Sequence, residues 1–146
     1  MKRKVITALL AATMVASLAV GCGNKGGDSK SDSSKSSSSD EITIGFSQVG
    51  AESDWRTANT ESMKSTFSEE NGYELIFDDA QQKQENQLTA IRNFIQQEVD
   101  YILLAPVTET GWDTVLKEAK DADIPVIIVD RMIDVSDDSL YTAWVG

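Results

Sequence analysis

The 146-residue chain has no histidine, one cysteine and two prolines. Without histidine it cannot form a Ser-His-Asp triad, a histidine general base or a histidine-ligated metal site. With one cysteine it cannot form an intrachain disulfide. Basic residues are also few, 13 against 24 acidic ones, and the net charge of −11 disfavours binding to a phosphate backbone. Several classes of enzyme and of nucleic-acid-binding protein are therefore excluded.

The charge is unevenly distributed along the chain. Residues 1–40 contain six of the basic residues and three of the acidic ones, which leaves a net charge of −14 on residues 41–146. The chain therefore divides into a basic, serine-rich front and an acidic part of the size of one domain.

The first residues have the layout of a secretory signal. A basic stretch at residues 2–4 precedes an uncharged, apolar run at residues 5–20, which ends in the small residues at 19–21. The run is shorter than the ~20 residues that span a bilayer comfortably. We predict a signal peptide over residues 1–21; an uncleaved anchor helix is the alternative.

Cys22 follows this segment directly. Residues 18–23 (LAVGCG) resemble the lipobox of bacterial lipoproteins, although Ala19 stands where leucine is usual. The following residues lack large apolar side chains, so residues 22–40 are predicted to be a solvated tether. We expect Cys22 to carry a lipid that anchors the protein at the outer face of the bacterial cytoplasmic membrane; the alternative is a cysteine without such a role.

Residues 41–146 alternate between predicted strands and predicted helices. Apolar or alternating runs predict strands at 41–47, 73–77, 101–105 and 126–129, with a weaker candidate at 140–145. Helical periodicity predicts helices at 56–70, at 81–98 and around 112–122, the first of which we expect to stop at Asn71-Gly72. This order predicts an α/β fold with a doubly wound parallel sheet.

Ligands of such sheets bind beyond the carboxyl ends of the strands. This rule selects residues 48–56, 78–82, 106–111 and 130–134. The glycine-containing segment 45–50 does not have the spacing of a dinucleotide or P-loop motif, which disfavours nucleotide binding. We therefore consider what the polar residues of these loops can do.

The first loop combines the groups that recognise a polyol. Glu52 and Asp54 can accept hydrogen bonds from hydroxyls, Ser53 and Arg56 can donate them, and Trp55 can cover the apolar face of a ring. A purely structural alternative is that Ser53 or Asp54 caps a helix, Trp55 packs on the sheet and Arg56 pairs with an acid in solvent.

Three other polar stretches have both a structural and a functional interpretation. Asp130 and Arg131 directly follow an apolar strand. They can form an ordinary ion pair at the surface, or they can be part of a ligand site. The stretch at 81–87 is most simply the polar start of a helix. Thr108, Glu109 and Thr110 could cap the next helix or add a polar group to a crevice.

Taken together, these segments resemble the galactofuranose-binding proteins of bacterial sugar ABC importers, which belong to the type I periplasmic binding proteins with ribose- and galactose-binding relatives. The resemblance covers nearly all of residues 42–142. It rests on GFSQVG (45–50), ES (52–53), WR (55–56), QQKQENQ (81–87), APV (105–107), TGW (110–112), LKEAKDA (116–122), IPV (124–126) and DR (130–131).

The resemblance implies a non-enzymatic protein without cofactors that binds a monosaccharide between two α/β lobes and delivers it to an ABC permease. It implies that Glu52, Ser53, Asp54, Trp55, Arg56, Asp130, Arg131 and Met132 contact the sugar. Two of these depart from the family, since Asp54 stands in place of glycine and Met132 in place of serine. Both departures affect which particular sugar we expect to bind, but not the expected class of ligand.

Family members are roughly twice as long as this chain. Residues 41–146 are therefore expected to form most of the first lobe of a monomeric binding protein. The same fold also occurs in sugar sensors that present their ligand to a membrane histidine kinase or chemoreceptor and in the effector domains of sugar-responsive repressors. A carbohydrate-active enzyme is a further alternative, which would need a pair of carboxyl groups such as Glu52 and Asp130 at a defined separation. Of these, the sensor is the main alternative.

Overall fold

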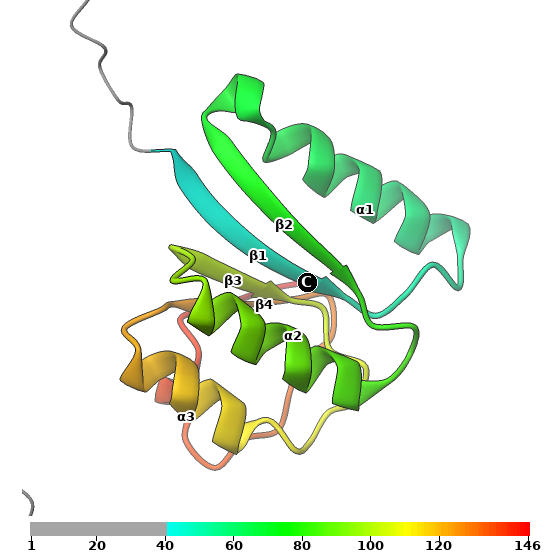
Figure 1. The fold of residues 1–146 in the computed structure, drawn as a ribbon. Coiled ribbons are helices and arrows are strands. Elements are labelled where there is room, and N and C mark those ends of the chain that lie inside the picture. Colours follow the sequence, from blue (N-terminus) through cyan, green and yellow to red (C-terminus); the bar gives the residue numbers. More distant parts are fainter. Residues whose placement is uncertain (1–40) are drawn as a thin grey trace, which may run out of the picture. The chain divides into compact units, whose positions relative to one another are not determined.

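The computed structural model describes residues 41–146; the predicted signal peptide, tether and Cys22 lie outside these residues (Figure 1). Strands and helices alternate along the chain. In order, the elements are β1 (Ile42–Gln48), α1 (Asp54–Thr66), a 3-10 turn (Glu69–Asn71), β2 (Tyr73–Asp79), α2 (Gln84–Gln96), β3 (Tyr101–Leu104), α3 (Asp113–Asp121), β4 (Val126–Val129), a second 3-10 turn (Asp138–Leu140) and β5 (Ala143–Val145).

The five strands form one parallel sheet in the order β2-β1-β3-β4-β5. The predicted α/β class and parallel sheet are confirmed, and the weak candidate at residues 140–145 supplies a short β5. The chain moves outward from β1 to β2 and then crosses back to β3. The switch point therefore lies between β1 and β3, where ligands of open α/β sheets bind.

One face of the sheet is covered by α2 and α3 (Figure 1). Its core contains Phe94, Trp112, Leu116 and Ile128, all almost fully buried. A side chain on Gly45 of β1 would come within 2.5 Å of the Phe94 ring, so the close approach of α2 to β1 requires glycine at this position. Tight apolar packing fixes these two helices on the sheet.

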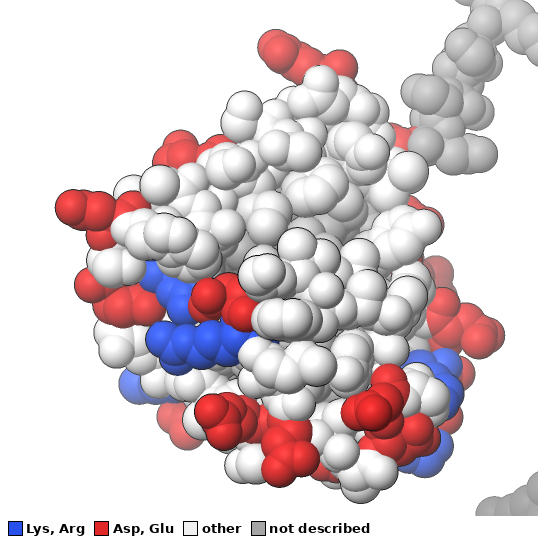
Figure 2. All heavy atoms as spheres, turned by 180° about the vertical axis from the view of Figure 1, so that it is seen from behind, with Lys and Arg blue, Asp and Glu red and all other residues white. Residues whose placement is uncertain are grey.

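The opposite face is covered less completely. Helix α1 contributes Met63 and Phe67 to its apolar cluster, and Arg56 is the one buried residue of α1. Figure 2, seen from behind, shows a broad area without charged side chains. An apolar groove of about 270 Å³ lies on this face, lined by Ile42, Ile44, Phe67, Tyr73, Tyr101, Leu103 and Ile127.

The end of α1 differs from prediction. Helix α1 stops at Thr66, and Gly72 ends the following 3-10 turn instead, with a left-handed φ of 85°. The prediction that Asn71-Gly72 ends this helix is therefore wrong. Helices α2 and α3 are each followed by an acidic residue in the left-handed region, Glu98 (φ 54°) and Asp123 (φ 59°), where glycine is usual.

Helices of residues 41–146 are all too short or too polar to cross a membrane.

Candidate ligand-binding site

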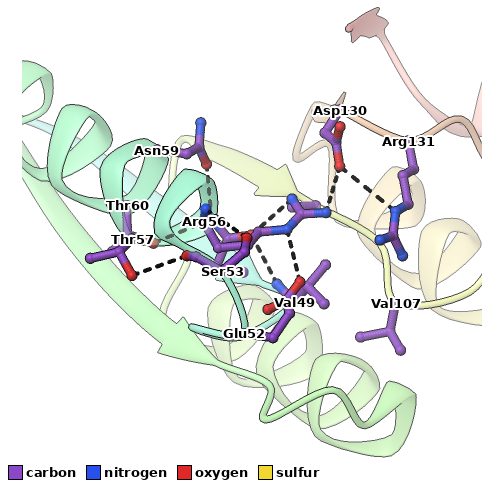
Figure 3. A network of polar contacts seen from close by, with 12 residues as sticks. Val49, Glu52, Ser53, Arg56, Thr57, Asn59, Thr60, Val107, Asp130 and Arg131 are labelled. Carbon is purple, nitrogen blue, oxygen red and sulfur yellow. Dashed lines mark hydrogen bonds and ion pairs between the residues drawn. The ribbon is translucent and has the colours of Figure 1, made fainter.

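Arg56 lies at the centre of a polar network at the carboxyl edge of the sheet (Figure 3). Its side chain is 4% exposed, although arginine is mostly found at the surface. Nη2 donates to Asp130 Oδ2 at 2.6 Å and Nε donates to Glu52 Oε1 at 3.1 Å. The buried charge is thus neutralised by two carboxylates, one from the β1–α1 loop and one from the end of β4.

Gln48 extends this network beneath Arg56. The side chain is fully buried at the end of β1. Its Oε1 accepts from the Val49 amide at 3.0 Å and from Arg56 Nη1 at 3.4 Å, while Nε2 donates to Asn59 Oδ1 at 2.8 Å. Because both ends of the amide group are used, Gln48 joins the strand to the second turn of α1 and fixes the guanidinium between them.

The start of α1 sets the direction of the loop residues. Ser53 is the N-cap, and its hydroxyl accepts from the Arg56 amide at 3.2 Å. This places Arg56 in the first turn, where its side chain can turn back toward the sheet. Of the two capping residues considered from the sequence, Ser53 is therefore correct. Asp54 occupies the exposed first turn, where a carboxylate complements the helix dipole.

Asp130 adopts a left-handed backbone conformation with φ of 70°. Aspartate tolerates this region better than most residues, but the conformation still carries a cost of the order of 1 kcal/mol. The turn comes directly after β4 and directs the carboxylate to Arg56, as Figure 3 shows. Backbone strain at an observed ion pair is typical of a functional position.

Trp55 is 54% exposed, so the alternative in which it packs on the sheet is wrong. The guanidinium carbon of Arg56 lies 4.8 Å from the centre of the Trp55 ring, which is a cation–π contact. The alternative of Arg56 pairing in solvent is also wrong, since Arg56 pairs while buried. A large aromatic ring therefore stands open to solvent beside a buried charged network.

Arg131 is more than half exposed and lies 3.8 Å from the Asp130 carboxylate through Nε. Met132 is exposed next to it. Both line a groove of about 450 Å³ with Glu109, Ile133 and Asp134. In contrast to Arg56, the Arg131 guanidinium has most of its N–H groups available for a ligand.

The structure thus brings Glu52, Ser53, Trp55, Arg56, Asp130 and Arg131 together at one edge, with Met132 along the adjoining groove. Asp54 is exposed and makes no hydrogen bond to this group within residues 41–146. The Thr108–Thr110 segment does not cap α3, because its N-cap position is Trp112 and has no side-chain cap bond. Glu109 of this segment instead lines the groove.

Two buried glutamines were not assigned a role from the sequence. Gln48 is described above. Gln87, on α2, donates to Ala105 O at 2.7 Å and accepts from the Val107 amide at 2.8 Å, so it holds the loop after β3. The polar stretch 81–87 is therefore only partly the start of a helix. Its first residues, Gln81 and Gln82, form a left-handed turn before α2 begins at Gln84.

A second polar pair lies near this edge, on the α2 side of the sheet. Ser47 of β1 and Asp78 of β2 are partners in the strand register. Ser47 Oγ and Asp78 Oδ2 are buried without a hydrogen-bond partner among the described residues. Burial, followed by the neighbouring charge of Asp79, raises the pKa of the Asp78 carboxyl.

The site combines carboxylate acceptors, one free guanidinium and an exposed aromatic ring. Such a set can hold an uncharged, hydroxyl-rich ring by hydrogen bonds at its edge and apolar contact at its face. In the described part of the chain, no group of three or more His, Cys, Asp or Glu side chains is placed to hold a metal ion.

The fold and this edge define a class: a parallel α/β lobe with a candidate polar site at its switch point. Residues 44–145 match the periplasmic binding protein domain. The chain belongs to this family, as the resemblance indicated.

The chain is similar to several known proteins of this family. It is 58% identical over 104 residues to the galactofuranose-binding protein YtfQ of Escherichia coli K12, a match that covers 71% of this chain and 32% of YtfQ. A Mycobacterium smegmatis protein in complex with β-D-fucofuranose is 57% identical with a TM-score of 0.69, covering 72% of this chain and 34% of that one. The binding protein of the Shewanella sp. ANA-3 arabinose ABC transporter, bound to L-arabinofuranose, is 58% identical with a TM-score of 0.68, covering 72% and 35%. The chain spans about a third of the length of these relatives.

Proposed function

We propose that this chain is part of a non-enzymatic binding protein of a sugar ABC importer, with a monosaccharide in furanose form as its ligand. The observation that carries the proposal is the network in which Arg56 joins Glu52 to Asp130 beside the exposed Trp55. The relatives described above, which bind galactofuranose, fucofuranose and arabinofuranose by their names, support the furanose class.

In this proposal the residues have distinct tasks. Arg131 donates to ligand hydroxyls, because its guanidinium is exposed. Glu52 and Asp130 accept from hydroxyls through the carboxylate oxygens that Arg56 leaves free, and Trp55 covers the apolar face of the ring. Ser53, Asp54 and Met132 line the rim. Arg56 itself mainly fixes the two carboxylates, since it is buried and already bonded to both.

The proposal includes the parts of the chain outside the described residues. Residues 1–21 are a signal peptide, residues 22–40 a tether with a lipid on Cys22, and residues 41–146 part of a first lobe that closes over the sugar with a second lobe. Metabolic labelling with a palmitate analogue tests the anchor. Label in the wild-type protein that disappears in Cys22→Ala is expected, and an unlabelled wild type would contradict it.

Calorimetry on the intact protein tests the ligand and the site. A panel of pentoses and hexoses, with D-galactose, D-fucose and L-arabinose at its centre, is expected to include one sugar that binds. Arg131→Ala should weaken this binding about tenfold or more, because removing one partner leaves a polar group unpaired at ~1–3 kcal/mol. Arg92→Ala, which removes an exposed arginine paired with Glu118 at 2.8 Å, is the matched control and should leave the affinity unchanged.

Two further observations separate this proposal from its competitors. Genes for a permease and an ATPase beside the coding gene support import, whereas a histidine kinase gene in their place would favour a sensor. Turnover of a nitrophenyl glycoside by the intact protein would contradict the non-enzymatic role, since that chemistry needs a pair of carboxyl groups at a defined separation.

A further inference from the structure

We propose that Trp144 of β5 is a positioning residue that holds the Asp130 peptide in the conformation required for its ion pair with Arg56. The predicted effect of Trp144 on ligand affinity rests on the proposed function. Its predicted effect on the geometry of the Asp130–Arg56 pair does not depend on that function. Trp144 was not among the candidate residues predicted from the sequence.

The first step concerns the direction of the Asp130 side chain. Asp130 follows β4 directly and has a left-handed φ of 70°. An extended conformation, which continues the strand, would turn the side chain in a different direction. The 2.6 Å bond to Arg56 Nη2 therefore depends on keeping this single residue in a less favourable backbone region.

The second step is that β5 contacts the Asp130 backbone at both of its polar atoms. The Asp130 amide donates to Val145 O at 2.8 Å, and the Asp130 carbonyl accepts from Trp144 Nε1 at 3.1 Å. The first bond belongs to the strand pairing, but the second is made by a side chain. Two bonds from neighbouring residues of β5 thus fix the orientation of the peptide groups on either side of Asp130.

The third step concerns the close packing around the same carbonyl. A side chain on Gly146 would come within 2.6 Å of Asp130 O and would overlap the Trp144 ring. The absence of a side chain at this position therefore lets the indole reach the carbonyl. Trp144 is itself 46% exposed, so packing in the core does not explain its orientation, whereas the hydrogen bond does.

β5 can therefore affect ligand binding without contacting the ligand itself. Trp144 holds Asp130, Asp130 pairs with Arg56, and Arg56 pairs with Glu52. Loss of the indole N–H should make the Asp130 backbone, and with it the ion pair to Arg56, less well ordered, while the apolar core stays unchanged.

The test is Trp144→Phe in the intact, isotope-labelled protein, because phenylalanine keeps an aromatic ring and removes the donor. Hydrogen exchange of the Arg56 Nε–H, measured by NMR, should become roughly three- to tenfold faster, which corresponds to the net contribution of one hydrogen bond. The Nε–H of Arg92, bonded to Glu118 at 2.8 Å away from β5, is the internal control and should not change. Tyr141→Phe removes a hydroxyl from the segment before β5 and is the matched variant without effect.

Sugar affinity supplies the second readout. Trp144→Phe should weaken the binding of the best sugar of the panel roughly three- to tenfold, with a melting temperature close to that of the wild type. Gly146→Ala places a methyl group against the same Asp130 carbonyl and should also make the Arg56 Nε–H exchange faster. This variant replaces Trp144→Phe as the test if Trp144→Phe does not fold.

The outcomes separate this inference from the proposed function. Unchanged Arg56 exchange in both variants would overturn the positioning role, whether or not a sugar binds. Faster Arg56 exchange in the two variants, together with a wild-type protein that binds no sugar of the panel, would support the positioning role and count against the proposed function.

Discussion

Replacing Arg56 by methionine tests whether the central ion-pair network stabilises the fold. Methionine keeps the unbranched, apolar stem of the buried side chain and removes the guanidinium. Glu52 and Asp130 then face each other without the cation that lies between them. The Val49 amide still donates to Gln48 Oε1, so the glutamine keeps most of its bonds.

The expected cost follows from the exposure of the partners. Hydrogen bonds to charged groups contribute roughly 1.5–3 kcal/mol each when buried. The carboxylates are 27% (Glu52) and 31% (Asp130) exposed, so water partly solvates them after the substitution and the lower end of this range applies. For two such bonds, Arg56→Met should lower the free energy of unfolding by about 3 kcal/mol, a large fraction of the ~5–15 kcal/mol of an ordinary domain.

Urea unfolding followed by far-UV circular dichroism measures this cost, with the slope m unchanged between variants. A double-mutant cycle with Asp130→Asn isolates the pair. Asparagine tolerates the left-handed backbone, and its uncharged amide oxygen can still accept a hydrogen bond from the Arg56 guanidinium, so Asp130→Asn alone should cost about 1 kcal/mol. In the Arg56→Met background the same substitution should cost nothing or stabilise, because it removes one of two facing carboxylates.

Two results would refute this account of the network. One is an unfolding free energy for Arg56→Met within about 0.5 kcal/mol of the wild type, the range of ordinary surface substitutions. The other is an equal cost of Asp130→Asn in both backgrounds, which would mean that the two side chains do not interact energetically.

Three further substitutions address other parts of the fold. Because burial raises the pKa of Asp78 above its ordinary value of 3.8, this carboxyl contributes progressively less stability as the pH rises from that value through the raised one. Asp78→Asn removes this contribution, so in pH-dependent urea unfolding its stability relative to the wild type should grow over this interval and then stay constant; parallel pH profiles would contradict this. Gly45→Ala forces a methyl group against the buried Phe94 ring and should cost about 2 kcal/mol, with an unchanged melting temperature as the contrary result. Asp123→Gly relieves a left-handed residue after α3 and should stabilise by about 0.5–1 kcal/mol in the same assay; destabilisation would show that the Asp123 side chain contributes a contact of its own.

The parts of the fold held by apolar packing could be predicted from the sequence. Strands β3 and β4 are continuous apolar runs, and this pattern is visible in the chain itself. Helices α2 and α3 cover one face of these strands, while Tyr101, Leu103 and Ile127 line the apolar groove on the other. Helix α3 has a clear apolar stripe in Val115, Leu116 and Ala119, which are all buried. Local periodicity determined these elements, so one sequence was sufficient.

The parts held by polar contacts were harder to predict. Helix α1 has only a weak apolar face because it is attached through Arg56 and Gln48, and its predicted end was therefore wrong by several residues. The sequence placed Arg56 at the carboxyl edge of the sheet, either as a ligand contact or as one partner of an ion pair in solvent. Its burial depends on Asp130, 74 residues away, and on a left-handed turn that no local pattern required.

The same separation of 74 residues has a consequence for how the protein folds. The ion pair between Arg56 and Asp130 closes a loop that contains β2, β3 and β4. Closing so long a loop has an entropic cost that the intervening contacts must first offset. A chain that has emerged only as far as α3 can already form most of its apolar core and still lacks Asp130. A site at this edge that includes Asp130 is therefore complete only once the chain has emerged beyond β4.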